Sequence, residues 1–266
     1  MKTELVVIAT IFAFFAVLEA LQGRFIRRPG QSRADVIVEV VGSVVLLTIT
    51  QPLILLASFA LMHRLAPHAE GALGHWPILG QIALLLLFDD MTQYWWHRTS
   101  HNIPFLYRLH RAHHNAAYMS VRIVYRNNIF YYAMMPGIWL SGALIYLGLG
   151  WIYACYAVVK LTVIMAAHSD TRWDAPLYKL RWLSPLMWVV ERTISTPSTH
   201  SAHHGKYMSD PYTYYKGNYG NFLFFWDVLF GTAKITRGYP REIGVENLPP
   251  VNAQTQLLWP VFRTKS

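Results

Sequence analysis

Eight of the twelve histidines in this chain lie in three tight clusters, and the need to bring these clusters together restricts how the chain can fold. The first cluster has an HxxxH pattern, and the other two, over residues 110–114 and 200–204, have an HxxHH pattern. Side chains three or four positions apart lie on one face of a helix, about 5–6 Å apart at Cβ. Imidazoles at that spacing can converge on a transition-metal ion. Eight imidazoles exceed what one ion can use, so the pattern predicts two metal ions bound by these ligands: His97, His101, His110, His113, His114, His200, His203 and His204.

The composition is that of an integral membrane protein. Hydrophobic residues make up 54% of the chain and charged residues only 14%, whereas soluble domains carry about a quarter charged residues. The apolar residues are also gathered into long runs. A single cysteine, Cys155, leaves no disulfide framework and no CxxC motif. We interpret the net charge of +9 as Lys and Arg gathered in cytoplasmic loops against anionic lipid, and not as a nucleic-acid surface.

The apolar runs predict an all-α membrane protein with about four to five transmembrane helices, forming one domain over residues 1–266. A crossing needs about 20 mostly apolar residues. Residues 5–21, 36–62 (with Pro52 as a kink) and 76–96 satisfy this requirement. The run 129–167 would measure roughly 58 Å as one helix at about 1.5 Å per residue, which is too long for one crossing. Glycines at 148 and 150 predict a tight turn between two spans, 129–147 and 150–167.

The same hairpin is required if the three histidine clusters share a site, because a single crossing between residues 114 and 200 would separate them. Four arginines lie between the first two spans, which makes that loop cytoplasmic: Arg24, Arg27, Arg28 and Arg33. The third span then delivers His97 to the cytoplasmic face. The prediction is a histidine-rich helical cap facing the cytoplasm, in what we expect to be a bacterial inner membrane.

Local signals predict how each cluster is held. The third span should continue as a helix to Ile103 and end before Pro104, and a short helix should follow that proline. Thr196 is a hydroxyl cap for the helix carrying the third cluster, which Gly205 closes. The apolar stretch 222–230 is too short to cross a bilayer and is either a buried core helix or an interfacial element beside the metals.

Three further residues lie near the predicted site. Asp90 lies two helical turns before His97 and could accept the N–H of a ligating histidine's far ring nitrogen, or be an interfacial acid without such contact. Asp89 receives no role. His168 lies alone at the end of the fifth span, at the predicted depth of the clusters, and is either a further ligand or an ordinary interfacial histidine.

The amino-acid sequence around the clusters resembles that of the fatty acid hydroxylase/sterol desaturase superfamily. The first part of the resemblance runs from Asp90 through Tyr94-Trp95-Trp96-His97-Arg98 to His113-His114. The second part comprises 196–205, Asn218-Tyr219-Gly220 and Trp226-Asp227 with Leu229-Phe230-Gly231-Thr232. It covers about residues 85–235, and the third cluster is especially similar to the alkylglycerol monooxygenase branch.

This resemblance implies a membrane-bound non-haem di-iron oxygenase that uses O₂ to hydroxylate a lipid C–H bond. It implies the eight clustered histidines as iron ligands and His168 as a ninth. Some members carry another histidine four residues later, where this chain has Arg172, so a tenth ligand stays open. Imidazole sites also accept zinc, which could replace iron in recombinant material.

Two electrons from outside are needed for each O₂. The chain has no dinucleotide-binding glycine motif and no cysteines for an iron–sulfur cluster, so we expect a separate reductase or electron carrier as a partner. A lipid or sterol desaturase using the same di-iron site is the alternative reaction. A histidine-rich membrane metal transporter is the alternative from another class, although its ionisable residues should lie at mid-membrane.

Overall fold

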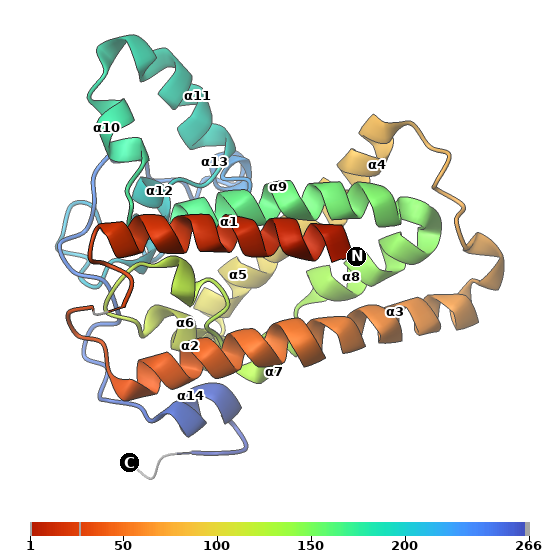
Figure 1. The fold of residues 1–266 in the computed structure, drawn as a ribbon, viewed down its shortest axis with the longest axis horizontal. Helices are drawn as coiled ribbons and strands as arrows, with labels where there is room; N and C mark the ends of the chain where they lie inside the picture. Colours follow the sequence, from red (N-terminus) through yellow and green to blue (C-terminus); the bar gives the residue numbers. More distant parts are fainter. Residues whose placement is uncertain (1, 27, 264–266) are drawn as a thin grey trace.

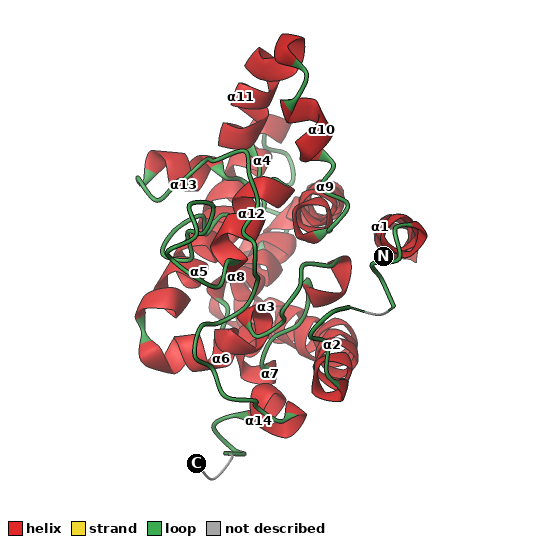
Figure 2. Ribbon diagram, turned by 90° about the vertical axis from the view of Figure 1, so that its left-hand side faces the viewer, coloured by secondary structure: helices red, strands yellow, loops and turns green. Residues whose placement is uncertain are grey.

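The computed structural model describes residues 2–26 and 28–263, and the regular secondary structure within those ranges is helical (Figures 1 and 2). Arg27, one of the four arginines of the first predicted loop, lies outside the described residues. The α-helices are α1 (Lys2–Leu21), α2 (Arg33–Val45), α3 (Gln51–Leu65), α4 (Ile78–Leu85), α5 (Thr92–Asn102), α6 (Pro104–His114), α7 (Ile129–Ala133), α8 (Pro136–Leu144), α9 (Gly150–His168), α10 (Asp174–Tyr178), α11 (Ser184–Thr193), α12 (Pro197–His204), α13 (Phe225–Leu229) and α14 (Ala253–Leu258).

Two helical stretches are long and apolar enough to cross a membrane, Arg33–Leu65 and Pro136–His168, and Val6–Leu21 is a shorter apolar helix. The first joins α2 to α3 through a π-helical turn, Leu46–Thr50, just before Pro52. A π turn can absorb the hydrogen bond that a proline removes, so the helix continues through the predicted kink position. A similar π turn, Leu86–Met91, joins α4 to α5, so the predicted third span is helical from Ile78 onwards.

The second long apolar stretch reverses direction in its middle, as the sequence predicts. Gly148 has a φ of 106°, inside the π-helical turn Ile145–Leu149, and Figure 1 shows α8 and α9 turning back at one end of the molecule. A Cβ at position 148 would lie 2.8 Å from the backbone N of Gly74. Glycine is therefore required there both by the backbone conformation and by the close approach of the 71–74 turn.

The predicted continuous helix over 129–147 is wrong. α7 ends at Ala133 and α8 begins at Pro136, with Met135 in an extended conformation. The proline explains the break, because its ring disfavours helical backbone at the preceding residue and it has no N–H to donate. α8 and the π turn after it are then short for a bilayer core of roughly 30 Å.

The long helices α1, α2 and α9 run in one common direction, and several segments that carry histidines lie toward one end of them. Figure 2 looks down the axes of α1, α2 and α9. In Figure 1, α6, α12 and the C-terminal end of α9 lie at the end opposite to the α8–α9 turn. The largest apolar cluster includes Leu85 of α4, Leu144 of α8 and Met165 of α9, and α1 packs along α9. This core holds the end of α9 against α12.

Candidate metal centre

The structure brings all nine sequence-predicted histidines into two adjacent groups. The first group contains five and the second contains four: His97, His101, His110, His114 and His203; and His113, His168, His200 and His204. Within each group, one nitrogen from each ring lies within 4.8 Å of the others. All nine are buried except His101, which is partly exposed. His168, ambiguous from its position in the sequence, therefore lies with the clustered histidines.

Local sequence signals place these side chains as expected. α5 ends at Asn102 with Ile103 extended, and Pro104 opens α6. Thr196 forms a capping box with Thr199 at the start of α12, and Gly205 follows its last residue. These boundaries confirm the predicted helix ends around all three clusters.

The adjacent histidines of each HxxHH motif divide between the groups. His114 and His203 belong to the first group, whereas their neighbours His113 and His204 belong to the second. Successive residues of a helix point about 100° apart, so a His-His pair can reach two centres side by side. α6 and α12 thus each contribute to both groups.

Most of the rings are oriented by a hydrogen bond at Nδ1. Four rings donate this bond to backbone carbonyls: His97 to Tyr219 O at 2.6 Å, His113 to Ile123 O at 3.1 Å, His168 to Ile164 O at 2.8 Å, and His203 to Gly217 O at 2.7 Å. The side-chain oxygen of Asn127 serves His110 in the same way at 3.0 Å. A carbonyl oxygen only accepts, so Nδ1 of these rings carries the proton and a neutral ring has a bare lone pair at Nε2.

Those bare Nε2 atoms face one another at short range. Nε2 of His97 lies 3.0 Å from Nε2 of His203, and Nε2 of His168 lies 3.4 Å from Nε2 of His113. Two lone pairs at such distances repel unless a cation lies between them. The structure therefore places neutral donors around two positions that call for positive charge.

Protons are poor candidates for that charge. Burial lowers the pKa of His97 to about 4, and burial together with the neighbouring His97 lowers the pKa of His203 well below its ordinary value. The remaining histidines of α5, α6 and α12 are shifted in the same direction, again chiefly by burial. Neutral imidazole is the form that binds metal.

A second observation fits a metal at the second group. Both ring nitrogens of His204 and Nδ1 of His200 are buried without a hydrogen-bond partner among the described residues. A buried polar atom without a partner costs free energy, and a bond from one ring nitrogen of His204 to a metal would remove part of that cost. Imidazole-only donors suit iron, zinc, copper or nickel.

The two acids before α5 contact other partners than the sequence suggests. Oδ2 of Asp90 accepts a hydrogen bond from Trp226 Nε1 at 2.8 Å, whereas the far nitrogen of His97 is held by the Tyr219 carbonyl. Asp89, which received no role, accepts from Tyr156 OH at 2.7 Å and forms a 2.5 Å ion pair with Lys160 of α9. Asp90 thus fixes the 219–227 segment, and Asp89 fixes α9, against the helix that carries His97.

The segment after α12 supplies support that sequence reasoning did not assign. Asp227 accepts hydrogen bonds from the backbone N–H groups of Tyr219 and Gly220 at 2.8 and 2.6 Å, and from the Thr232 hydroxyl at 2.6 Å. It thereby holds the Tyr219 carbonyl on His97. These residues lie in the motifs that carry the family resemblance, so a signal was present, whereas nothing in the sequence singled out Asn127.

Arg172, at the position where some superfamily members have a histidine, points elsewhere. Its guanidinium pairs with Asp170 at 3.0 Å and lies over the ring of Tyr239. His63, in the last turn of α3, lies 3.7 Å from Glu70 and belongs to neither group.

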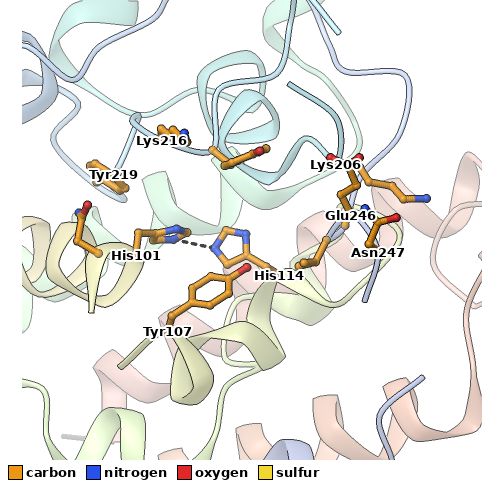
Figure 3. A pocket seen from close by; sticks show the side chains of 12 residues that line it. His101, Tyr107, His114, Lys206, Lys216, Tyr219, Glu246 and Asn247 are labelled. Carbon is orange, nitrogen blue, oxygen red and sulfur yellow. Dashed lines mark hydrogen bonds between the residues drawn. The ribbon is translucent and has the colours of Figure 1, made fainter. Parts of the chain in front are cut away.

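A cavity of about 820 Å³ reaches the first group from outside (Figure 3). His101 and His114 form part of its wall, 3.1 Å apart at Nε2. Polar and charged side chains line much of the rest, including Tyr107, Lys206, Lys216 and Glu246. This cavity gives a ligand access to the first group.

Comparisons with known proteins identify the family of this chain. The family model described as fatty acid hydroxylase matches residues 82–232. Alkylglycerol monooxygenase of Danio rerio is 29% identical over 166 residues, which are 60% of this chain and 33% of that protein. The human enzyme of the same name is 26% identical, over 66% of this chain and 36% of its own length. The ornithine lipid hydroxylase OlsE of Rhizobium tropici is 30% identical, over 59% of this chain and 43% of its own length. No solved structure matches.

The chain thus spans between about a third and two fifths of the length of these relatives. The match to the family model covers more than half of the chain, including both HxxHH motifs and the segment that Asp227 holds. The family predicted from the histidine motifs is confirmed: this chain belongs to the fatty acid hydroxylase family.

Proposed function

We propose that this chain is a membrane-bound non-haem di-iron lipid hydroxylase, with one iron in each histidine group. O₂ is the co-substrate, and a separate reductase or electron carrier supplies two electrons for each turnover. The names of the relatives above give alkylglycerols and an ornithine lipid as their substrates, and this supports a lipid substrate for this chain. We place the site at the cytoplasmic face of the membrane, as the arginine-rich first loop suggests.

The facing Nε2 atoms are the observation that supports two ions most directly. The His97–His203 pair lies in the first group and the His113–His168 pair in the second, so each group has its own need for a cation. Five and four imidazoles are enough to hold one ion each. Iron bound there would supply the activation of O₂ that attack on an unactivated C–H bond requires.

The residues of the chain itself prepare the site for that chemistry. The carbonyls of Tyr219, Gly217 and Ile123 fix the tautomer of their histidines and direct Nε2 inward. Burial of the second group excludes water from its surroundings. The cavity beside His101 and His114 is the position at which we expect the reacting C–H bond to be presented.

A metal transporter is less well supported. The histidine-bearing segments gather at one end of the long helices, and backbone carbonyls fix Nδ1 of four rings, which suits a resident metal better than a transported one. A desaturase stays open, because substrate placement decides between the two reactions on one site.

The test combines metal analysis with product analysis. The protein is purified in detergent with iron, supplied with O₂, a reductase system and a lipid extract, and the lipids are compared by mass spectrometry. His101→Ala and His200→Ala should each lower the metal content from two to about one and abolish product, whereas His63→Ala should retain both. A hydroxylase adds one oxygen to the lipid, and a desaturase removes two hydrogens. Full metal content in both site variants, with no oxidised lipid from the unaltered protein, would overturn the proposal.

A further inference from the structure

One exposed surface outside the metal centre is apolar, whereas a surface that faces water is usually polar. It is formed by the outward side chains of α11, the turn before it and α13, which we call the α11–α13 face: Trp182, Leu186, Trp188, Val189, Phe225, Val228 and Leu229. Trp182 is 76% exposed, Leu186 58% and Trp188 54%. Contiguous exposed apolar side chains of this size mark a binding surface for protein or membrane.

The inner side of α11 explains why the apolar side faces outward. Glu191 is buried and accepts two hydrogen bonds from Arg237, from Nη2 at 2.8 Å and from Nε at 2.9 Å. A helix facing water has its polar side outward and its apolar side inward. Here Met187 and the paired Glu191 lie inside, whereas tryptophan, leucine and valine lie outside, so the outward side of the helix suits an apolar medium.

The α11–α13 face continues the surface of a predicted membrane-crossing helix. α11 packs on α13, and Phe230, directly after α13, contacts Trp95 of α5 with ring centroids 5.0 Å apart. Trp95 is itself partly exposed, and Leu87 and Phe88 are exposed two turns earlier on the same continuous helix. The apolar surface therefore runs from the predicted third span to α13 and on to α11.

The charges beside this face also favour a lipid surface. The charged side chains of residues 174–193 that are not buried are all basic: Lys179, Arg181 and Arg192. The two acids in this segment, Asp174 and Glu191, are buried. The Arg192 guanidinium lies 4.3 Å from the ring centroid of Trp188. Tryptophan beside cationic side chains is the composition of helices that lie in the interface of an anionic leaflet.

We propose that the α11–α13 face is seated in the headgroup and upper acyl region of the leaflet on the histidine side of the molecule. The proposal rests on the membrane embedding of the proposed function, but not on its chemistry.

The α11–α13 face is connected to the metal centre through α10, which packs against both α11 and α12. Oδ2 of Asp174 accepts a hydrogen bond from the backbone N–H of Ser198 in the first turn of α12, at 2.9 Å. α12 carries His200, His203 and His204. Lipid contact at α11 would thus hold α12 at a fixed depth relative to the leaflet.

The test measures depth at single labelled positions. In a Cys155→Ala background, Leu186→Cys is labelled with the fluorophore NBD and the protein is reconstituted into vesicles of phosphatidylcholine and phosphatidylglycerol. Ser209→Cys, at an exposed polar position after α12, is the control. We expect the label at 186 to emit at shorter wavelength, to be quenched by lipids with a nitroxide high on the acyl chain, and to resist iodide, whereas the label at 209 is quenched by iodide.

Leu229→Cys in α13 provides a second position, because the two sites should behave alike. Equal iodide quenching at 186, 229 and 209 would overturn the proposal. Protection from both iodide and nitroxide lipid would overturn it as well, because that result means that protein covers the face. An inactive enzyme with lipid-quenched labels would instead contradict only the proposed function.

Discussion

At the scale of single residues, Asn127 offers a test of how the ligand rings are held. Among the described residues, its side chain is the one other than histidine that forms a hydrogen bond with a ligand ring. Its oxygen accepts from Nδ1 of His110, and its amide donates to the Tyr132 hydroxyl at 3.0 Å. We expect Asn127→Leu to lower metal affinity at the first group by about 10–100-fold, the usual effect of losing such a partner. Competition with a chromophoric chelator measures this.

Asn127→Asp is the matched control, since a carboxylate keeps the acceptor for His110. It should retain most of the affinity that Asn127→Leu loses. Equal loss in both variants would mean that packing at this position, and not the hydrogen bond to the ring, determines the affinity.

The buried rings also predict how the metal-free protein responds to pH. The pKa of His97 is about 4 in the folded chain, below the ordinary value of 6.5, because burial disfavours the charged form. Between pH 6.5 and 4 the unfolded chain therefore binds more protons than the folded chain, and the free energy of unfolding falls as the pH falls. The other histidines of α5, α6 and α12 act in the same direction.

The measurement is the thermal midpoint of the chelator-treated protein in detergent at pH 7.5, 6.5 and 5.5. We expect the midpoint to drop over this range. The His63→Ala variant, which changes a histidine outside both groups, should show the same drop, whereas a flat profile in the unaltered protein would contradict the prediction.

At the scale of the elements, one ion pair connects the helix of His97 to that of His168. Lys160 Nζ lies 2.5 Å from Asp89 Oδ2, and both side chains are nearly buried. We expect Lys160→Met to destabilise the protein by about 3–5 kcal/mol, because it leaves a buried carboxylate without its cation. Adding Asp89→Asn should recover part of the loss, since the amide oxygen can still accept from Tyr156 and the amide nitrogen can donate to the Ser141 hydroxyl. Thermal unfolding in detergent compares the variants, and equal losses in the single and double variants would exclude an uncompensated charge as the cause.

The α8–α9 turn depends on a single glycine. Gly148→Ala places a side chain at a φ of 106° and in contact with Gly74, so we expect a loss of stability of about 1–3 kcal/mol. Gly150→Ala is the matched control, because Gly150 has helical angles and a Cβ there would lie no closer than 3.8 Å to its nearest neighbour. The thermal midpoints of the two variants should differ clearly, and equal values would mean that the turn tolerates a side chain.

At the scale of the whole molecule, the proposed function and the lining of the cavity beside the first group together predict where a lipid would be oxidised. Lys206, Lys216, Glu246 and Tyr107 suit a polar headgroup better than an acyl chain. We therefore expect the new hydroxyl within a few bonds of the headgroup, located by fragmentation of the product in tandem mass spectrometry. Hydroxylation near the methyl end of an acyl chain would contradict this use of the cavity.

How much of this molecule could be predicted from its sequence depends on the range of the interactions involved. The helix ends at Pro104, Thr196 and Gly205 follow local rules and are confirmed. The turn at Gly148 was predictable because the clusters had to meet on one side. The break before Pro136 carried a local signal that the long apolar run obscured. The partners of Asp89, Asp90 and His110 lie 71, 136 and 17 residues away, and no local pattern specifies such contacts.

The division of each His-His pair between the two groups has a consequence for how such sequences can diverge. Inserting or deleting one residue inside either HxxHH motif would rotate the downstream ring by about 100° and exchange or empty its place in the centre. Substitutions elsewhere on α6 or α12 leave the register intact. Among relatives, insertions and deletions should therefore accumulate in the segments between the motifs, while the five-residue length of each motif stays fixed.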